Sequence, residues 1–208
     1  MRSSQIFREL IKTQELVQLP GCYDCITAKM VEKSGFPAAY LTGSGISLTL
    51  TGQPDLNTVS YLELRQVVQN IRSTVDIPML VDIDTGFGAP LNTYRLVKDF
   101  ERLDIAAVQI EDQMMPKKCG HELGRVLVSD TEMVKRIRTI YENREENGLV
   151  IVARTDARTV VRTGRGNPPR QPVSGSRCGC DLCGKSRKLR GSVPDRKRDQ
   201  RPGAVQQC

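Results

Sequence analysis

The sequence predicts a parallel α/β fold over residues 1–160, followed by a basic segment of a different kind. Two observations indicate this fold class. Short apolar runs alternate along the chain with amphipathic stretches at helical spacing, and strand–helix alternation gives a parallel sheet. The runs are also apolar on both faces, as parallel strands covered by helices require.

Five apolar runs are the predicted strands. Each ends in small or polar residues, and they lie at 16–21, 38–45, 78–88, 105–112 and 148–156. The amphipathic stretches between them predict helices at 26–33, 61–71, 93–103 and 131–141. Glu132 follows Ser129 by three residues, which is the spacing of a capping box at the start of the last helix.

Residues 161–208 differ in composition from the rest of the chain. They hold 12 Lys and Arg against 3 Asp and Glu, which leaves 19 basic and 21 acidic residues in 1–160. They also contain 5 of the 11 prolines and no aromatic residue. Such a segment buries too little apolar surface to offset its ordering entropy, so we expect it to be disordered.

Composition limits the class of protein. A chain of 208 residues is long enough for a substantial core. The first residues lack the apolar stretch of a secretion signal and no later stretch approaches a membrane span, so we expect a cytoplasmic protein without membrane contact. Seven cysteines in that compartment indicate thiols rather than a disulfide framework, and Cys22 and Cys25 are assigned to the core or to a helix start.

Charged side chains stand where the predicted strands end. Asp82 and Asp84, two apart in "LVDID", are expected on one side of a strand. Glu111 closes the next strand and Arg154 the one after. Acids and a guanidinium at the carboxyl ends of successive parallel strands fit a barrel active site, and clustered carboxylates suit Mg²⁺. Acids that cap the following helices are the structural alternative.

Two loops add candidate groups. "TGSG" at 42–45 offers backbone N–H groups to a carboxylate or a developing oxyanion, although a plain turn accounts for it equally well. In "PKKCGH", Cys119 is flanked by Lys117, Lys118 and His121, the one histidine in the sequence. Neighbouring cations favour the thiolate and suit a thiol to proton transfer, whereas an isolated cysteine is usually structural.

These segments together resemble a known family. "YLTGSG", "VDIDTGFG", "IEDQMMPKKCGH" and "VARTDAR", in this order and spacing, are similar to the isocitrate lyase/phosphoenolpyruvate mutase superfamily. Its short members include methylisocitrate lyase, 2,3-dimethylmalate lyase and carboxyvinyl-carboxyphosphonate phosphorylmutase. The resemblance covers about residues 15–160. It implies a (β/α)8 barrel of the TIM type, here truncated after about five strands.

The resemblance also implies roles for individual residues. Mg²⁺, with Mn²⁺ as the alternative metal, would be held directly or through waters by Asp82, Asp84 and Glu111. Contacts to the substrate would come from Tyr40, Thr42, Gly43, Ser44, Asp55 and Gly120. Catalytic roles would fall to Cys119, Lys118, His121 and Arg154.

The implied chemistry is cleavage of a carbon–carbon bond in a small 2-hydroxy or 2-keto di- or tricarboxylic acid. Arg154 would grip a carboxylate, and Cys119, on a gating loop over 113–125, would be the general acid/base. Phosphonomutase members of the superfamily generally lack the cysteine motif, so Cys119 favours a lyase over a mutase. Family members are homo-oligomers that act on small carboxylic acids.

The tail has three interpretations. Read in an alternative frame with permitted codons, residues 165–185 become a family-like helix and a strand that ends in glutamate, so we expect a frameshifted segment and a chain that is inactive alone. A zinc knuckle on Cys178, Cys180 and Cys183 would need a fourth ligand, for which only Cys208 is available in the tail. A basic arm would bind nucleic acids without sequence specificity.

Overall fold

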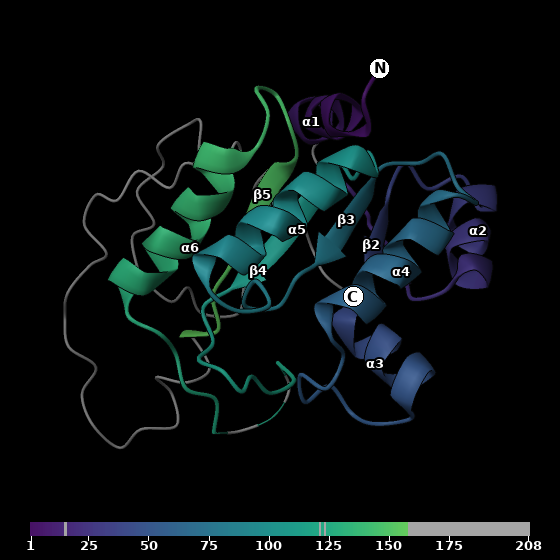
Figure 1. The fold of residues 1–208 in the computed structure, drawn as a ribbon. Coiled ribbons are helices and arrows are strands. Elements are labelled where there is room, and N and C mark those ends of the chain that lie inside the picture. The colour runs from purple at the N-terminus through teal and green to yellow at the C-terminus, as the bar shows by residue number, and fades with distance from the viewer. Residues whose placement is uncertain (15, 121, 123, 158–208) are drawn as a thin grey trace, which may run out of the picture.

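The computed structural model describes residues 1–14, 16–120, 122 and 124–157 (Figure 1). Five strands of the described residues form one parallel sheet in the order β1-β2-β3-β4-β5, so each strand lies beside its neighbour in sequence. The last four fall within their predicted runs, whereas the first begins only at Gly21, the final residue of the run at 16–21. The parallel α/β prediction is therefore confirmed. The strands are β1 Gly21–Cys22, β2 Ala39–Leu41, β3 Met79–Asp82, β4 Ala107–Glu111 and β5 Val150–Arg154.

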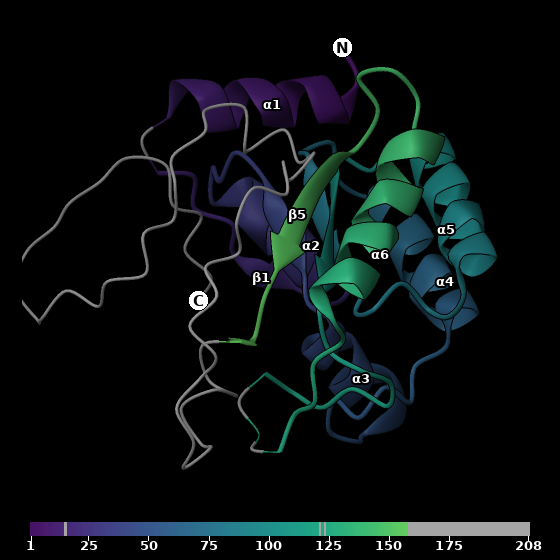
Figure 2. The ribbon, with the colours of Figure 1, turned by 90° about the vertical axis from the view of Figure 1, so that its left-hand side faces the viewer.

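Four helices run along one face of this sheet, as Figures 1 and 2 show: α2 Cys25–Lys33, α4 Tyr61–Arg72, α5 Pro90–Arg102 and α6 Asp130–Asn143. The predicted helices are thus confirmed to within three residues at each end. Their apolar sides pack with alternate strand residues, among them Leu41, Val81, Val108 and Ile151. Helix packing on the sheet fixes the outer wall of the fold.

Two helices were not predicted. α1, Ser3–Thr13, lies across the amino ends of the strands, and α3, Gly43–Thr51, follows the carboxyl end of β2 (Figure 2). α3 begins inside the "TGSG" segment, where Thr42 is its N-cap. That segment is therefore the first turn of a helix rather than a plain turn.

The other face of the sheet is covered differently from the prediction. Phe7 of α1 packs there with Leu80, Ala107 and Val150, which point away from the four-helix layer. No helix of the described residues extends this cover to the carboxyl ends of the strands. The expectation of strands apolar on both faces consequently holds near α1 and fails at the other end, where the inward residues are polar.

One predicted helix cap is half correct. Ser129 Oγ accepts a hydrogen bond from the Glu132 backbone N–H, but the Glu132 carboxylate lies 3.7 Å from Arg136 Nε in place of the reciprocal bond. A complete capping box occurs at α4, where Ser60 Oγ accepts from the Glu63 N–H and the Ser60 N–H donates to Glu63.

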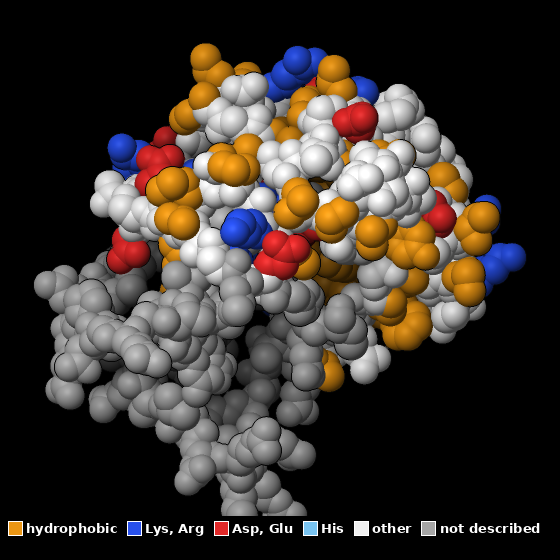
Figure 3. All heavy atoms as spheres, turned by 90° about the horizontal axis from the view of Figure 1, so that it is seen from below, with side chains coloured by type: hydrophobic (Ala, Val, Ile, Leu, Met, Phe, Trp, Pro, Cys, Tyr) orange, Lys and Arg blue, Asp and Glu red, His pale blue; other side chains and the backbone are white. Residues whose placement is uncertain are grey.

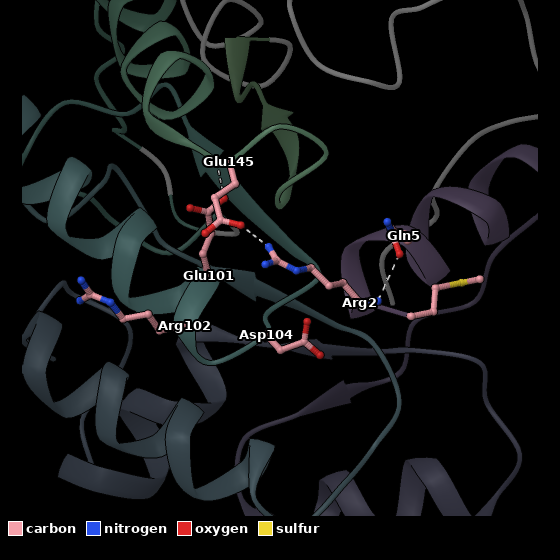
Figure 4. Close-up of a pocket in the computed structure, with 7 residues that line it drawn as sticks. Arg2, Gln5, Glu101, Arg102, Asp104 and Glu145 are labelled. Carbon is pink, nitrogen blue, oxygen red and sulfur yellow. Dashed lines mark hydrogen bonds and ion pairs between the residues drawn. The ribbon is translucent and has the colours of Figure 1, made fainter.

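α1 is tied to the loop that leads into β4. The backbone N–H and the hydroxyl of Ser3 both donate to the Asp104 carboxylate, which also pairs with Arg72 at 3.0 Å. A broad hollow of about 740 Å³ lies beside this contact, at the amino-end side of the sheet (Figure 4). Its walls carry mixed charges, including the Arg2–Glu145 ion pair. Within the described residues, no helix is both long and apolar enough to cross a bilayer.

The inner cluster under α1 yields a stability prediction. Leu80 is 1% exposed, so Leu80→Ala is expected to lower the free energy of unfolding by about 2–5 kcal/mol through lost burial and a new cavity. Leu62, on the outer side of α4, is 60% exposed, and Leu62→Ala should change stability by about 0.5 kcal/mol or less. Urea unfolding of the two variants measures both values, and equal losses would contradict this packing.

Candidate active site

The carboxyl ends of three neighbouring strands bring the predicted residues together. β3 ends at Asp82, β4 at Glu111 and β5 at Arg154. Glu111 pairs in register with Arg154, and Asp82 with Gln109. Because the strands are parallel and adjacent, these side chains share one edge of the sheet.

Asp82 is held from the inner side of the sheet by Tyr40. The Tyr40 hydroxyl donates to Asp82 Oδ2 at 2.8 Å and accepts from Gln109 Nε2 at 3.0 Å. Burial and the charge of Asp82 raise the pKa of Tyr40, so the phenol stays protonated and acts as a donor. Gln109 completes this chain of hydrogen bonds, and the sequence had not singled it out.

Asp84 reaches the site in a different way from the prediction. It lies beyond the end of β3 with a φ of 49°, so the alternation of a strand does not orient it. Its backbone N–H donates to Asp82 Oδ1 at 3.1 Å, and its carbonyl accepts from the Glu111 N–H at 2.9 Å. The turn after β3 therefore places the two aspartates together by backbone contacts. Burial and the charge of Asp82 raise the pKa of Asp84, while Lys117 opposes the shift.

Lys117 is the lysine that enters the site. Its Nζ lies 2.5 Å from Asp84 Oδ1 and 2.7 Å from the Asp55 carboxylate, and its side chain is 3% exposed. Burial alone lowers the pKa of Lys117, but Asp84 and Asp55 outweigh that effect and raise it. Lys118, which the sequence favoured, is exposed. Nothing in two adjacent lysines distinguishes the buried one before the loop folds.

Glu111 and Arg154 form the second charged pair. Arg154 Nη1 lies 3.3 Å from Glu111 Oε2, and Nη2 lies 3.3 Å from Asp156 Oδ2. Burial raises the pKa of Glu111 to about 7, against the opposing charge of Arg154. Glu111 Oε1 is buried without a hydrogen-bond partner among the described residues. An acceptor left in this state is suited to a cation or a water.

The Cys119 loop is held by hydrogen bonds between the Gln113 side chain and the loop backbone. The Gln113 side chain, 1% exposed, accepts from the Lys118 N–H at 3.0 Å and donates to the Lys118 carbonyl at 2.9 Å. Gln113 also donates to Asp156 Oδ2 at 2.9 Å, next to Arg154. The loop and the end of β5 are therefore linked through one amide side chain.

Gly120 lies against Arg154. A Cβ on Gly120 would collide with the Arg154 guanidinium, and the Gly120 carbonyl accepts a hydrogen bond from Arg125. Arg125 is buried and lies 3.7 Å from Asp156, so it is a further loop contact that the sequence did not indicate. Cys119, one residue earlier, is half-buried. His121 lies outside the described residues.

The first turn of α3 faces the aspartates. A Cβ on Gly43 would lie 3.4 Å from Asp84 Oδ1 and 3.6 Å from Asp82 Oδ2. Ser44, the next residue, is half-exposed. The first backbone N–H groups of a helix lack partners within the helix, so this turn presents donors close to the two carboxylates. Cys22 is buried on β1 and Cys25 begins α2, as predicted.

Asp55, Asp82 and Asp84 border a cavity of about 10 Å³, which is also lined by Gly43, Ile46, Ser47, Asn57, Val59, Leu64 and Phe87. This volume is close to the space that one water or a small cation occupies. Among the described residues, no three His, Cys, Asp or Glu side chains lie close enough to hold a metal ion together. The donors nevertheless fit Mg²⁺, which binds one or two carboxylates and keeps several waters.

Hydrophobic side chains are exposed on the described part of this end of the molecule. Figure 3 shows it from below, with hydrophobic side chains spread over the part that is not grey. Leu48 and Leu50 of α3 and Leu56 after it are 56%, 47% and 43% exposed. Asp82, Asp84 and Glu111 are buried, whereas these leucines are exposed.

Comparison with known proteins identifies the family. The family model for phosphoenolpyruvate phosphomutase matches residues 7–171. The chain belongs to the phosphoenolpyruvate mutase/isocitrate lyase family. The predicted resemblance is therefore confirmed, and with it an enzyme family of lyases and mutases.

Named family members are similar in sequence. The chain is 42% identical over 159 residues to 2,3-dimethylmalate lyase of Eubacterium barkeri, which covers 76% of this chain and 55% of that protein. It is 44% identical over 159 residues to 2-methylisocitrate lyase of Aeropyrum pernix, covering 76% and 51%. The chain spans about half the length of these family members.

Solved structures of the family share the fold. Oxaloacetate acetylhydrolase in complex with the inhibitor 3,3-difluorooxalacetate gives a TM-score of 0.71 at 32% identity, over 75% of this chain and 54% of that one. Phosphonopyruvate hydrolase in complex with oxalate and Mg²⁺ gives 0.68 at 29%, over 76% and 53%. These likenesses confirm the TIM-barrel type of fold for the described strands.

The raised pKa of Glu111 predicts a pH-dependent stability in metal-free protein. Folded Glu111 binds its proton more tightly than at the ordinary pKa of 4.5, so its contribution to stability is fully present below pH 4.5 and is lost as the pH rises to about 7. Glu111→Gln removes this loss. Urea unfolding in EDTA measures the free energy of unfolding of both proteins. Relative to the unsubstituted protein, the value for the variant should rise by on the order of 1–3 kcal/mol across that pH range. A constant difference would contradict the assignment.

The Gln113 contacts predict how firmly the Cys119 loop is held. Gln113→Leu removes both hydrogen bonds to Lys118 at similar side-chain size, so exchange of the Lys118 amide hydrogen should accelerate about tenfold or more. Gln66→Leu, which changes an exposed glutamine on α4, is the matched control and should leave that amide unchanged. Mass spectrometry of exchanged peptides measures the rate, and unaltered protection would show that other contacts hold the loop.

Proposed function

We propose that this chain carries the metal-binding acids and the catalytic thiol of a lyase active site. The lyase cleaves a carbon–carbon bond in a small 2-hydroxy or 2-keto di- or tricarboxylic acid. One observation carries the proposal. The buried acids and the Arg154 guanidinium meet at one edge of the sheet, with Gly120 of the Cys119 loop directly against Arg154. Substrates of the methylisocitrate, dimethylmalate and oxaloacetate type fit, since each combines carboxylates with an adjacent oxygen.

Cationic and N–H groups of the site are proposed to bind the substrate, and carboxylates of the site to bind the metal. Arg154 binds a substrate carboxylate through its fork of N–H donors. The N–H groups at the start of α3 lie near the two aspartates and suit a second anionic oxygen. Asp82, Asp84 and Glu111 would hold Mg²⁺, or Mn²⁺ as the alternative, which when bound polarises the substrate oxygen as a Lewis acid.

Cys119 is the proton donor of the proposed reaction. When the carbon–carbon bond of a 2-hydroxy acid breaks, the hydroxyl gives its proton to a base and becomes a carbonyl, and the electron pair of the bond remains on the other fragment as an enolate. The thiol then supplies the proton that the enolate carbon needs. Gln113 and Arg125 donate hydrogen bonds to the loop backbone beside Arg154, which keeps the thiol loop at the edge of the site. Lys118 and His121 remain proposed cationic neighbours of the thiol.

Phosphonomutase chemistry is the second candidate, because the matching family model is named for phosphoenolpyruvate phosphomutase. A mutase moves a phosphoryl group within the substrate, so the reacting carbon forms a bond to phosphorus. That carbon does not need a proton from a thiol. The cysteine motif "KKCGH" therefore favours cleavage. Replacing Cys119 separates the two candidates, because only the lyase depends on its proton.

Residues 161–208 are proposed to be a frameshifted replacement of the later barrel. The five strands of the described residues have two open sheet edges and an inner face that α1 covers only at their amino ends, so this chain is expected to be inactive by itself. Sequencing the gene around codons 160–163 would reveal or exclude a one-base slip. An intact reading frame there would contradict the frameshift.

An activity assay tests the function. The chain and a frame-restored version are each given Mg²⁺ with methylisocitrate, dimethylmalate, oxaloacetate and phosphoenolpyruvate. The products are identified by mass spectrometry, as keto acids from the first two substrates and as oxalate from oxaloacetate. We expect turnover of a carboxylic acid only by the restored chain, and a loss of about 100-fold or more in its Cys119→Ser variant. Cys25→Ser, at the start of α2, is the matched control and should keep full activity. Equal turnover by both chains would refute the proposal that the altered tail makes this chain inactive.

A further inference from the structure

Lys117 and the predicted metal site use the same carboxylates. The ammonium lies 2.5 Å from Asp84 and 2.7 Å from Asp55, and both acids also line the cavity of about 10 Å³ beside Asp82. Lys117 comes from the loop after β4, two residues before Cys119. The position of the thiol loop is therefore tied to the charge of the site.

The lysine offsets a charge that would otherwise be unpaired. Asp84 is buried next to Asp82, and the Asp84 N–H already binds Asp82 Oδ1, which fixes their arrangement. Two neighbouring buried carboxylates need a cation, and the Lys117 ammonium contacts Asp84 in this structure. A divalent ion at the same carboxylate would meet the ammonium at close range in a weakly screened interior.

We propose that Lys117 and a divalent cation compete for Asp84, so that Lys117 docks the Cys119 loop while the cation is absent and releases it when the cation binds. This inference rests on the metal role in the proposed function. Asp82, which is held by Tyr40, stays available to the cation, as does Glu111 Oε1, which has no hydrogen-bond partner in the described part of the chain. The coupling is reciprocal: the factor by which Lys117 weakens cation binding equals the factor by which the cation weakens loop docking.

Cation affinity tests the competition. Isothermal titration of the full chain with Mg²⁺ is compared for the unsubstituted protein, Lys117→Met and Lys118→Met. Mg²⁺ is the probe because thiols bind it poorly, so the cysteines do not interfere. We expect Lys117→Met to bind Mg²⁺ about tenfold more tightly or better, and Lys118→Met, which changes the exposed neighbour, to stay within about twofold. Unchanged or weaker binding by folded Lys117→Met would overturn the inference.

Accessibility of Cys119 provides a second test that needs no variant. The unsubstituted protein, kept in a phosphine reductant, is alkylated with iodoacetamide with and without Mg²⁺, and each cysteine is followed by peptide mass spectrometry. Mg²⁺ should accelerate alkylation of Cys119 about fivefold or more, while buried Cys22 stays unchanged. Alkylation that slows or does not change would overturn the inference even if Lys117→Met fails to fold.

The outcomes separate this inference from the proposed function. Mg²⁺ binding that is equal in all three proteins leaves the metal role intact and removes only the competition. If neither the unsubstituted chain nor folded Lys117→Met binds Mg²⁺, both the metal role and the competition are wrong. Circular dichroism of each variant establishes that it is folded before either conclusion is drawn.

Discussion

Burial of several carboxylates at one edge of the sheet is the constraint on which the rest of the site depends. A buried acid without a counter-charge destabilises a fold, so Asp84 and Glu111 must each meet a cation. Lys117 reaches Asp84 from the loop after β4, and Arg154 reaches Glu111 from the end of β5. The charge balance thereby determines where that loop lies.

The loop is held on both of its sides by groups that belong to the site. Lys117 docks on the aspartates, and Gly120, three residues later, packs on Arg154. Gln113 fixes the backbone between them at Lys118. Cys119 therefore belongs to a short segment whose position responds to both charged pairs. An enzyme that must open for substrate and close for proton transfer needs such a responsive segment.

Much of the framework could be predicted from the sequence because its determinants are local. Helical periodicity located α4 and α6, and apolar runs located β3, β4 and β5. The capping box at Ser60 could have been found by the same spacing rule that was applied to Ser129. α1 was missed because it lies before the first apolar run, and α3 because its first turn is rich in glycine. Strand-end residues pointed to the site, since parallel strands bring their carboxyl ends to one edge.

The sequence by itself determined the parallel order of elements, the family and the types of residue at the strand ends. Tertiary structure decided which of two adjacent lysines is buried, how Asp84 turns toward Asp82 beyond the end of β3, and that Gln109, Gln113 and Arg125 support the site. Periodicity and spacing report contacts between near neighbours in the chain. Lys117 and Asp55 are separated by 62 residues, and only folding brings such a pair together.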